Sequence, residues 1–76
     1  MNKQDLAAGD RVVCIDNGQQ RVGTIGGRPG KFDVTLDGEQ YPARLRFYRN
    51  ANQYKGTYGH TNGKYSSGIV VLRLAD

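Results

Sequence analysis

Residues 31–38 read KFDVTLDG, and this stretch decides the fold class. Apolar side chains at positions 32, 34 and 36 alternate with polar side chains at 31, 33 and 35. Because successive side chains of a β-strand point to opposite faces of the sheet, this alternation predicts a strand with one buried face. Asp37-Gly38 follows at once, and this dipeptide is a strong signal for a hairpin turn. The stretch therefore predicts one strand and one turn of an antiparallel sheet.

The same period of two recurs on both sides of this stretch. It predicts further strands at residues 11–15, 20–25, 39–48 and 68–74. Asn17-Gly18 predicts a tight turn after the first of these strands, whereas residues 26–30, which read GGRPG, predict a loop. Pro42 has no amide donor, so the strand at 39–48 should begin at a sheet edge or a bulge. The residues before Gly9 can form one helical turn.

Residues 49–68 leave two interpretations open. They contain four glycines and three asparagines, which dilute any periodic pattern. One interpretation is a long loop rich in Gly and Tyr. The other is a hairpin that turns at Asn62-Gly63 and places Tyr58 and His60 on the same face as Tyr65. We favour a partial hairpin with a flexible beginning.

These elements predict a small all-β domain that occupies residues 1–76. Because an open sheet of this size would expose its edge strands, we expect five strands that close partly into a barrel. The alternation places seven residues among the predicted core: Val13, Ile15, Phe32, Val34, Leu45, Phe47 and Val70.

A short motif in the first half of the chain resembles a known fold family. Gly9-Asp10-Arg11-Val12 precedes Asn17-Gly18, and Val22-Gly23-Thr24-Ile25 precedes the strand that ends in Asp37-Gly38. This order, over roughly residues 9–38, resembles the opening of SH3-like small barrels, in particular KOW and Tudor-like modules. The KOW resemblance implies binding of RNA or protein on a ribosome or transcription complex. The Tudor-like resemblance implies an aromatic cage, to which we assign no residue.

Charge is distributed unevenly along the chain, whose net charge is +4. Residues 40–75 contain no carboxylate, but they contain six cations and six aromatic rings: Arg44, Arg46, Arg49, Lys55, Lys64 and Arg73, with Tyr41, Phe47, Tyr48, Tyr54, Tyr58 and Tyr65. Cations attract phosphate at long range, and aromatic rings offer flat faces on which bases stack. The pattern predicts an anionic partner, with nucleic acid, either DNA or RNA, as the leading candidate.

The candidate binding residues follow from strand periodicity. Arg44, Arg46 and Tyr48 stand two residues apart and should project from one face, which Arg49 extends. The next segment places aromatic rings beside hydrogen-bond donors, as an adaptable binding loop does. It adds six candidate binding residues: Tyr54, Lys55, Tyr58, His60, Lys64 and Tyr65. The structural alternative is a solvated outer face on the strand and tyrosines that only pack.

Composition argues against several other functions. One His and one Cys give a catalytic or metal site few members, so we expect no enzyme activity, no metal and no cofactor. Cys14 lies in a Val-Val-Cys-Ile run and is predicted to be a buried thiol. The first residues lack the apolar stretch of a secretion signal, and no segment approaches the roughly 18 apolar residues of a membrane span. We expect a cytoplasmic protein without a membrane partner.

The sequence therefore predicts a monomeric or weakly dimeric barrel that binds nucleic acid with modest sequence specificity. The alternative is a protein-interaction module, a small inhibitor or adaptor that docks its basic surface on an acidic protein or on a transcription or ribosomal complex. Arg and Tyr are also enriched in protein interfaces, so composition alone does not separate the two. A third possibility is a structural subunit of a larger particle.

Overall fold

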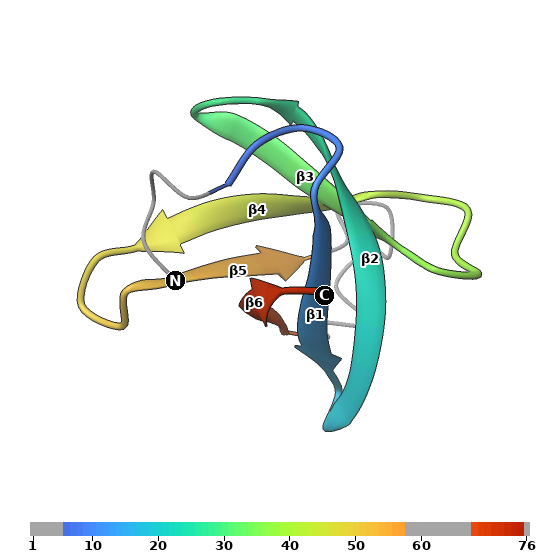
Figure 1. Cartoon of the computed structure of the whole chain (residues 1–76). Helices are drawn as coiled ribbons and strands as arrows, with labels where there is room; N and C mark the ends of the chain where they lie inside the picture. The colour runs from blue at the N-terminus through green and yellow to red at the C-terminus, as the bar shows by residue number, and fades with distance from the viewer. Residues whose placement is uncertain (1–5, 58–67, 76) are drawn as a thin grey trace.

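A computed structural model describes residues 6–57 and 68–75, which form six β-strands and no helix. The strands are β1 (Arg11–Asp16), β2 (Gln19–Arg28), β3 (Lys31–Leu36), β4 (Ala43–Tyr48), β5 (Gln53–Thr57) and β6 (Ile69–Leu74). Each strand pairs antiparallel with the next, and β6 pairs with β1, so the sheet closes into a barrel (Figure 1). The predicted all-β class is confirmed. The predicted five strands and partial closure are wrong, because β5 is an additional strand and the ring is closed.

β5 lies within the segment that the sequence leaves ambiguous. Its residues pair with β4 from Tyr48 opposite Gln53 to Arg44 opposite Thr57. The connecting turn begins at Arg49, whose carbonyl oxygen accepts a hydrogen bond of 3.2 Å from the amide of Asn52. Because β5 also pairs with β6, it fills the gap that would otherwise leave two exposed sheet edges. The predicted turn at residues 62–63 lies outside the described residues.

The first two hairpins have tight turns. Asn17 and Gly18 have positive φ angles of 53° and 82°, as the predicted hairpin turn requires, and this prediction is confirmed. The loop predicted at residues 26–30 is shorter in the structure, because β2 continues to Arg28. Only Pro29 and Gly30 form that turn, so Arg28 and Lys31 lie directly opposite each other.

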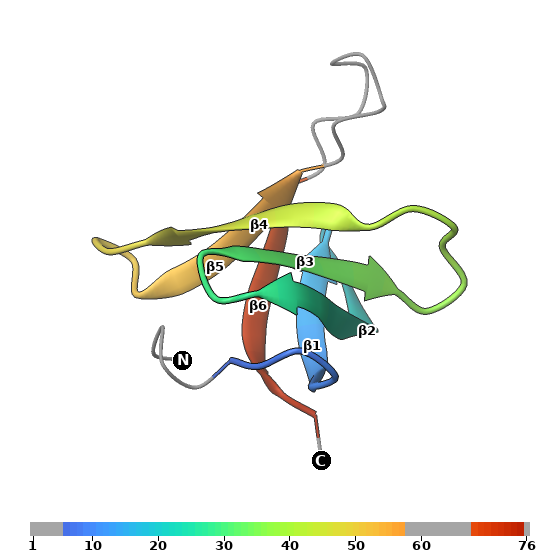
Figure 2. The same cartoon turned by 90° about the horizontal axis from the view of Figure 1, so that it is seen from above.

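The connection from β3 to β4 is longer. The amide of Glu39 donates a 2.9 Å hydrogen bond to the carbonyl oxygen of Leu36, which makes the predicted turn at Asp37-Gly38. The chain then continues to Pro42 without strand pairing, so the fourth strand begins at Ala43 rather than at residue 39. Figures 1 and 2 show this loop and the β4–β5 turn at opposite ends of the molecule.

The core lies inside the ring and draws on all six strands. Its buried members are Leu6, Val12, Cys14, Ile25, Phe32, Val34, Leu36, Ala43, Leu45, Tyr54, Ile69 and Val71. Burial of Phe32, Val34 and Leu45 is confirmed, whereas Phe47 is only partly buried against the cluster. Leu6 precedes β1, and in the turn that follows it Gly9 donates a hydrogen bond of 2.7 Å to the carbonyl oxygen of Ile25.

The predicted inner faces of β1 and β6 differ from those in the structure, although the predicted burial of Val13 is confirmed. Val12 and Cys14 point into the core where Val13 and Ile15 are predicted; Val13 is buried outside the main cluster and Ile15 is half-buried. On β6, Ile69 and Val71 are fully buried, and Val70 is half-buried. Both strands carry apolar residues at successive positions, so alternation does not identify the inner face. The β1–β6 register also shifts between Val13 and Cys14.

In the part of the chain that the structure describes, no helix is long and apolar enough to cross a membrane.

Candidate nucleic-acid interface

The acids that form ion pairs in the described residues all pair with two arginines, Arg11 of β1 and Arg21 of β2. Arg11 donates two hydrogen bonds, of 2.8 and 2.6 Å, to the two carboxylate oxygens of Asp37. Arg21 contacts the carboxylates of Asp16 at 3.3 Å and Glu39 at 3.4 Å. The hydrogen bonds from Arg11 lower the pKa of Asp37. Charge is therefore neutralised locally around β1, β2 and the loop that follows β3.

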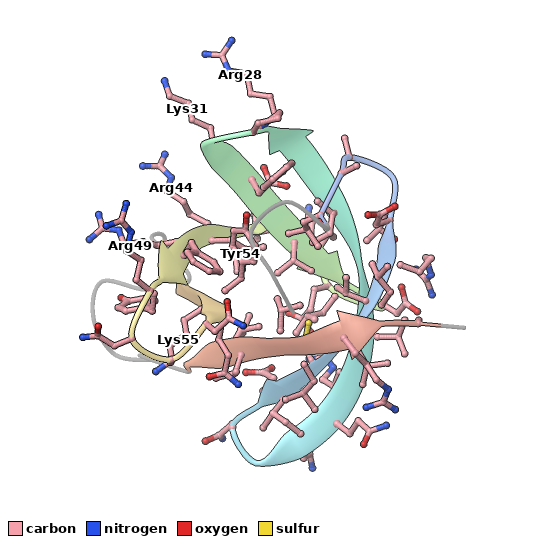
Figure 3. All side chains as sticks on the ribbon, turned by 60° about the vertical axis from the view of Figure 1, so that its left-hand side comes forward. Arg28, Lys31, Arg44, Arg49, Tyr54 and Lys55 are labelled. Atoms are coloured by element: carbon pink, nitrogen blue, oxygen red, sulfur yellow. The ribbon has the colours of Figure 1, made fainter. Side chains whose placement is uncertain are left out.

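The opposite situation holds on the outer surface that runs from the end of β2 across β3 and β4 to β5, including the β4–β5 turn. Six cations there form no ion pair within 4.0 Å with any described carboxylate. Figure 3 shows Arg28, Lys31, Arg44 and Arg49 along one side of the barrel. We call the following set the basic face: Arg28, Lys31, Arg44, Arg46, Arg49 and Lys55, together with the ring of Tyr48.

Four of these cations form two like-charge pairs across neighbouring strands. Arg28 lies opposite Lys31, and Arg46 lies opposite Lys55. Side chains directly opposite in an antiparallel pair have Cβ atoms about 4.5–5.5 Å apart, and like charges at such positions are destabilising. The Nζ atom of Lys55 lies 5.2 Å from the centroid of the Tyr48 ring, a cation–π contact. The fold thus holds together positive charges that repel each other.

One carboxylate, Asp33, lies between these pairs. It is opposite Gly26 on one side and opposite Arg44 on the other. Its Oδ1 atom lies only 2.8 Å from the position that a Cβ on Gly26 would occupy, so the carboxylate leans over β2. It forms no ion pair within 4.0 Å with Arg44. The missing side chain at Gly26 therefore gives Asp33 room to lie away from the arginine.

Tyr54 is a sequence-predicted site residue that the structure places in the core. Its side chain is 4% exposed. Its ring packs edge-to-face against Phe47 and Phe32, with ring centroids 5.1 and 6.0 Å away. Burial raises the pKa of Tyr54. Because this ring has no open face for a base, we exclude Tyr54 from the interface and assign it to the packing beneath β4 and β5 (Figure 3).

Tyr48 is the exposed ring that lies beside the cations. It is 44% exposed at the end of β4, next to the turn that carries Arg49. Tyr41, which is 52% exposed, lies in the loop at the other end of the same strand. The remaining predicted site residues lie outside the described residues: Tyr58, His60, Lys64 and Tyr65.

Sequence reasoning missed Arg28 and Lys31 as members of the basic face. They flank Pro29-Gly30, and residues that flank a two-residue turn become cross-strand neighbours. The pairing of β3 with β4 then sets Asp33 opposite Arg44, so the β2–β3 hairpin adjoins the predicted β4 face. The Arg-Pro-Gly-Lys sequence therefore contained a usable signal for a local pair of positive charges.

Side chains that could bind a metal ion do not cluster in the described residues. These residues contain no group of three or more His, Cys, Asp or Glu side chains placed to hold a metal ion. Cys14 is fully buried, as predicted. Burial raises the pKa of the Cys14 thiol to about 11, with a smaller effect of the nearby Asp16 charge, so the thiol stays protonated near neutral pH.

Comparisons with protein-family models, with curated proteins and with solved structures found no significant match to this chain. The structure itself shows a small closed antiparallel barrel in which the ion-paired acids and the cations of the basic face lie on different surfaces.

Proposed function

We propose that this barrel binds nucleic acid through the basic face. The observation that carries the proposal is the two cross-strand pairs of cations, Arg28 opposite Lys31 and Arg46 opposite Lys55, which have no ion pair to a described carboxylate. A phosphate group placed near each pair would replace repulsion by attraction. Such contacts provide affinity that depends little on sequence and strongly on salt.

The resemblance to SH3-like KOW and Tudor-like modules agrees with this proposal. It rests on the motif in residues 9–38; the described fold is a small antiparallel barrel, closed and with six strands rather than the five that we expected. Within the proposal, cations of β2 to β5 contact the phosphates and Tyr48 stacks on one base. Because most contacts go to the backbone, specificity at most positions is modest.

An acidic protein is the competing partner. Protein interfaces have an apolar centre surrounded by a polar rim. The large exposed apolar side chains of the described residues are Tyr41, Tyr48 and Leu74. Tyr41 and Tyr48 lie at opposite ends of β4, so they do not form one apolar centre. This distribution favours a polyanion with exposed bases over a protein surface.

The salt dependence of binding tests the proposal. Single- and double-stranded DNA and RNA are titrated between about 50 and 200 mM salt, where log K should fall with log salt by about 0.7–0.9 for each phosphate contact. Arg44→Ala should reduce the slope by about one contact. The matched control is Arg73→Ala, because Arg73 is an exposed cation of β6 that lies opposite Val13 of β1. Failure of all four nucleic acids to bind at the lowest salt concentration rejects the proposal and leaves an acidic protein as the partner.

Replacement of Tyr48 separates stacking from charge. Tyr48→Leu should weaken binding to a single-stranded oligonucleotide by about 1–3 kcal/mol, because a stacked base loses its aromatic partner, while the salt slope stays nearly unchanged. Tyr41→Leu is the control, since Tyr41 is similarly exposed at the other end of β4. Fluorescence anisotropy measures both affinities after each variant is shown to melt near the parent. If Tyr48→Leu binds as tightly as the parent, the ring does not stack and the interaction is electrostatic.

A further inference from the structure

An acid within a surface that binds phosphates needs an explanation. Asp33 is the one carboxylate on β3, and the pairing of the strands places it between Gly26 and Arg44. It repels phosphate, so it lowers the general affinity of the basic face for any polyanion. An ion pair with Arg44 would be the simplest role for Asp33. However, no guanidinium nitrogen of Arg44 lies within 4.0 Å of a carboxylate oxygen of Asp33.

The carboxylate of Asp33 has unused acceptor capacity. No described residue donates a hydrogen bond to it, and it is half-buried on the outward face of β3. Its Oδ1 atom lies over the backbone of Gly26. An ionised carboxylate accepts hydrogen bonds and donates none. Asp33 therefore presents acceptors to a ligand that the neighbouring cations hold by its phosphates.

Amino groups of bases are the nucleic-acid donors that fit such acceptors. On its Watson–Crick edge, guanine presents two adjacent donors, N1–H and the N2 amino group, which match the two oxygens of one carboxylate. Cytosine and adenine present one amino group beside a ring nitrogen acceptor, which would face the second oxygen unfavourably. We propose that Asp33 recognises an unpaired guanine through these two hydrogen bonds, an inference that rests on the proposed nucleic-acid function.

This recognition requires a single strand, because the Watson–Crick edge of a paired guanine is occupied. Arg44, opposite Asp33, stands four residues before Tyr48 on β4, which corresponds to about 13 Å along a strand. One base cannot span that distance, so guanine at Asp33 and the base stacked on Tyr48 belong to different nucleotides. Asp33 thus adds specificity at one position to binding that is otherwise sequence-tolerant.

The test compares single bases in a uniform background. Oligonucleotides of about ten nucleotides, within the usual site size of a small barrel, contain uracil or thymine at every position except one. That position holds guanine, hypoxanthine, which lacks the N2 amino group, or adenine. The parent should bind the guanine oligonucleotide about fivefold to a hundredfold more tightly than the adenine one, with hypoxanthine between them.

The affinities of Asp33→Asn for the three oligonucleotides should lie within about twofold of one another, because one acceptor oxygen of the carboxylate is replaced by a donor NH2 group. Glu39→Gln is the control for charge, because it removes one negative charge at a residue outside the basic face. Glu39→Gln should keep the guanine preference. Equal binding of the three oligonucleotides by the parent, or an unchanged preference in Asp33→Asn, overturns the guanine site and leaves the proposed function intact. Absence of binding to every oligonucleotide instead refutes the proposed function itself.

Discussion

Phe32→Ala is expected to lower the free energy of unfolding by about 3–5 kcal/mol, because it leaves a cavity in the core. Phe32 is 4% exposed, and its ring packs edge-to-face on Tyr54 at a centroid distance of 6.0 Å. It therefore links β3 to β5, two strands that are not neighbours in the barrel. A domain of this size has a net stability of about 3–5 kcal/mol from a single core, so the variant should be largely unfolded.

Urea denaturation followed by circular dichroism measures this effect. Phe47→Ala serves as the graded control, because Phe47 contacts the same Tyr54 ring at 5.1 Å but is only partly buried. Its loss of stability should be clearly smaller, since less apolar surface leaves water when the parent folds. Equal denaturation midpoints for Phe32→Ala and the parent would contradict the position of Phe32 in the core.

Gly27→Ala is expected to cost about 2–5 kcal/mol of stability, from two separate causes. The φ angle of Gly27 is +86°, a conformation that costs an L-residue about 1–2 kcal/mol. In addition, a Cβ at this position would overlap the backbone carbonyl oxygen of Lys31. The backbone of the β2–β3 hairpin would have to move, which adds about 1–3 kcal/mol.

Gly30→Ala isolates the first cause, the backbone conformation. Gly30 has the same φ angle of +86°, but a Cβ there would meet nothing within 4 Å. Gly30→Ala should therefore cost only the conformational part, and the difference between the two denaturation midpoints measures the clash. If the two variants are equally stable, the close approach of Gly27 to Lys31 is wrong. Because Arg28 and Lys31 belong to this hairpin, Gly27→Ala should also weaken nucleic-acid binding in any fraction that remains folded.

The sequence predicts an element correctly where its two faces differ in polarity. β3 is such a strand, because Phe32, Val34 and Leu36 alternate with polar residues. β1 and β6 are apolar at successive positions, so their inner faces depend on the barrel closure and on the register shift at Val13. These are properties of the assembled sheet, and no local pattern contains them.

The sequence does not predict β5, for a different reason. Its two inward positions are Tyr54 and Gly56, of which the glycine contributes no hydrophobic signal. Tyr54 stands beside Lys55 in the sequence, and that neighbour favours a binding role for the ring. In the structure the two side chains lie on opposite faces of the strand, as period two requires. An aromatic residue next to a cation is therefore weak evidence for stacking until its face is known.

The candidate site was predictable in part. Arg44 and Arg46 share a face through their spacing alone. Arg28 and Lys31 were not expected there, because the first half of the chain is nearly neutral when its charges are counted along the sequence. The paired and unpaired charges become separated in the folded barrel, where Arg11 and Arg21 pair with the acids around β1 and β2. Counting charge along a chain does not show which charges neutralise one another.

The pairing of β1 with β6 also has a consequence for how the chain folds. Asp16 pairs with Ile69, so the contacts that close the ring join segments separated by most of the chain. Such a high contact order is typical of β-proteins that fold in milliseconds to seconds. During synthesis, the hairpins from β1 to β3 can form as soon as their residues emerge, but one edge of β1 has no partner until β6 follows. Until then the nascent protein carries an unprotected strand edge at Val12 and Cys14, and an unpaired edge of this kind favours aggregation.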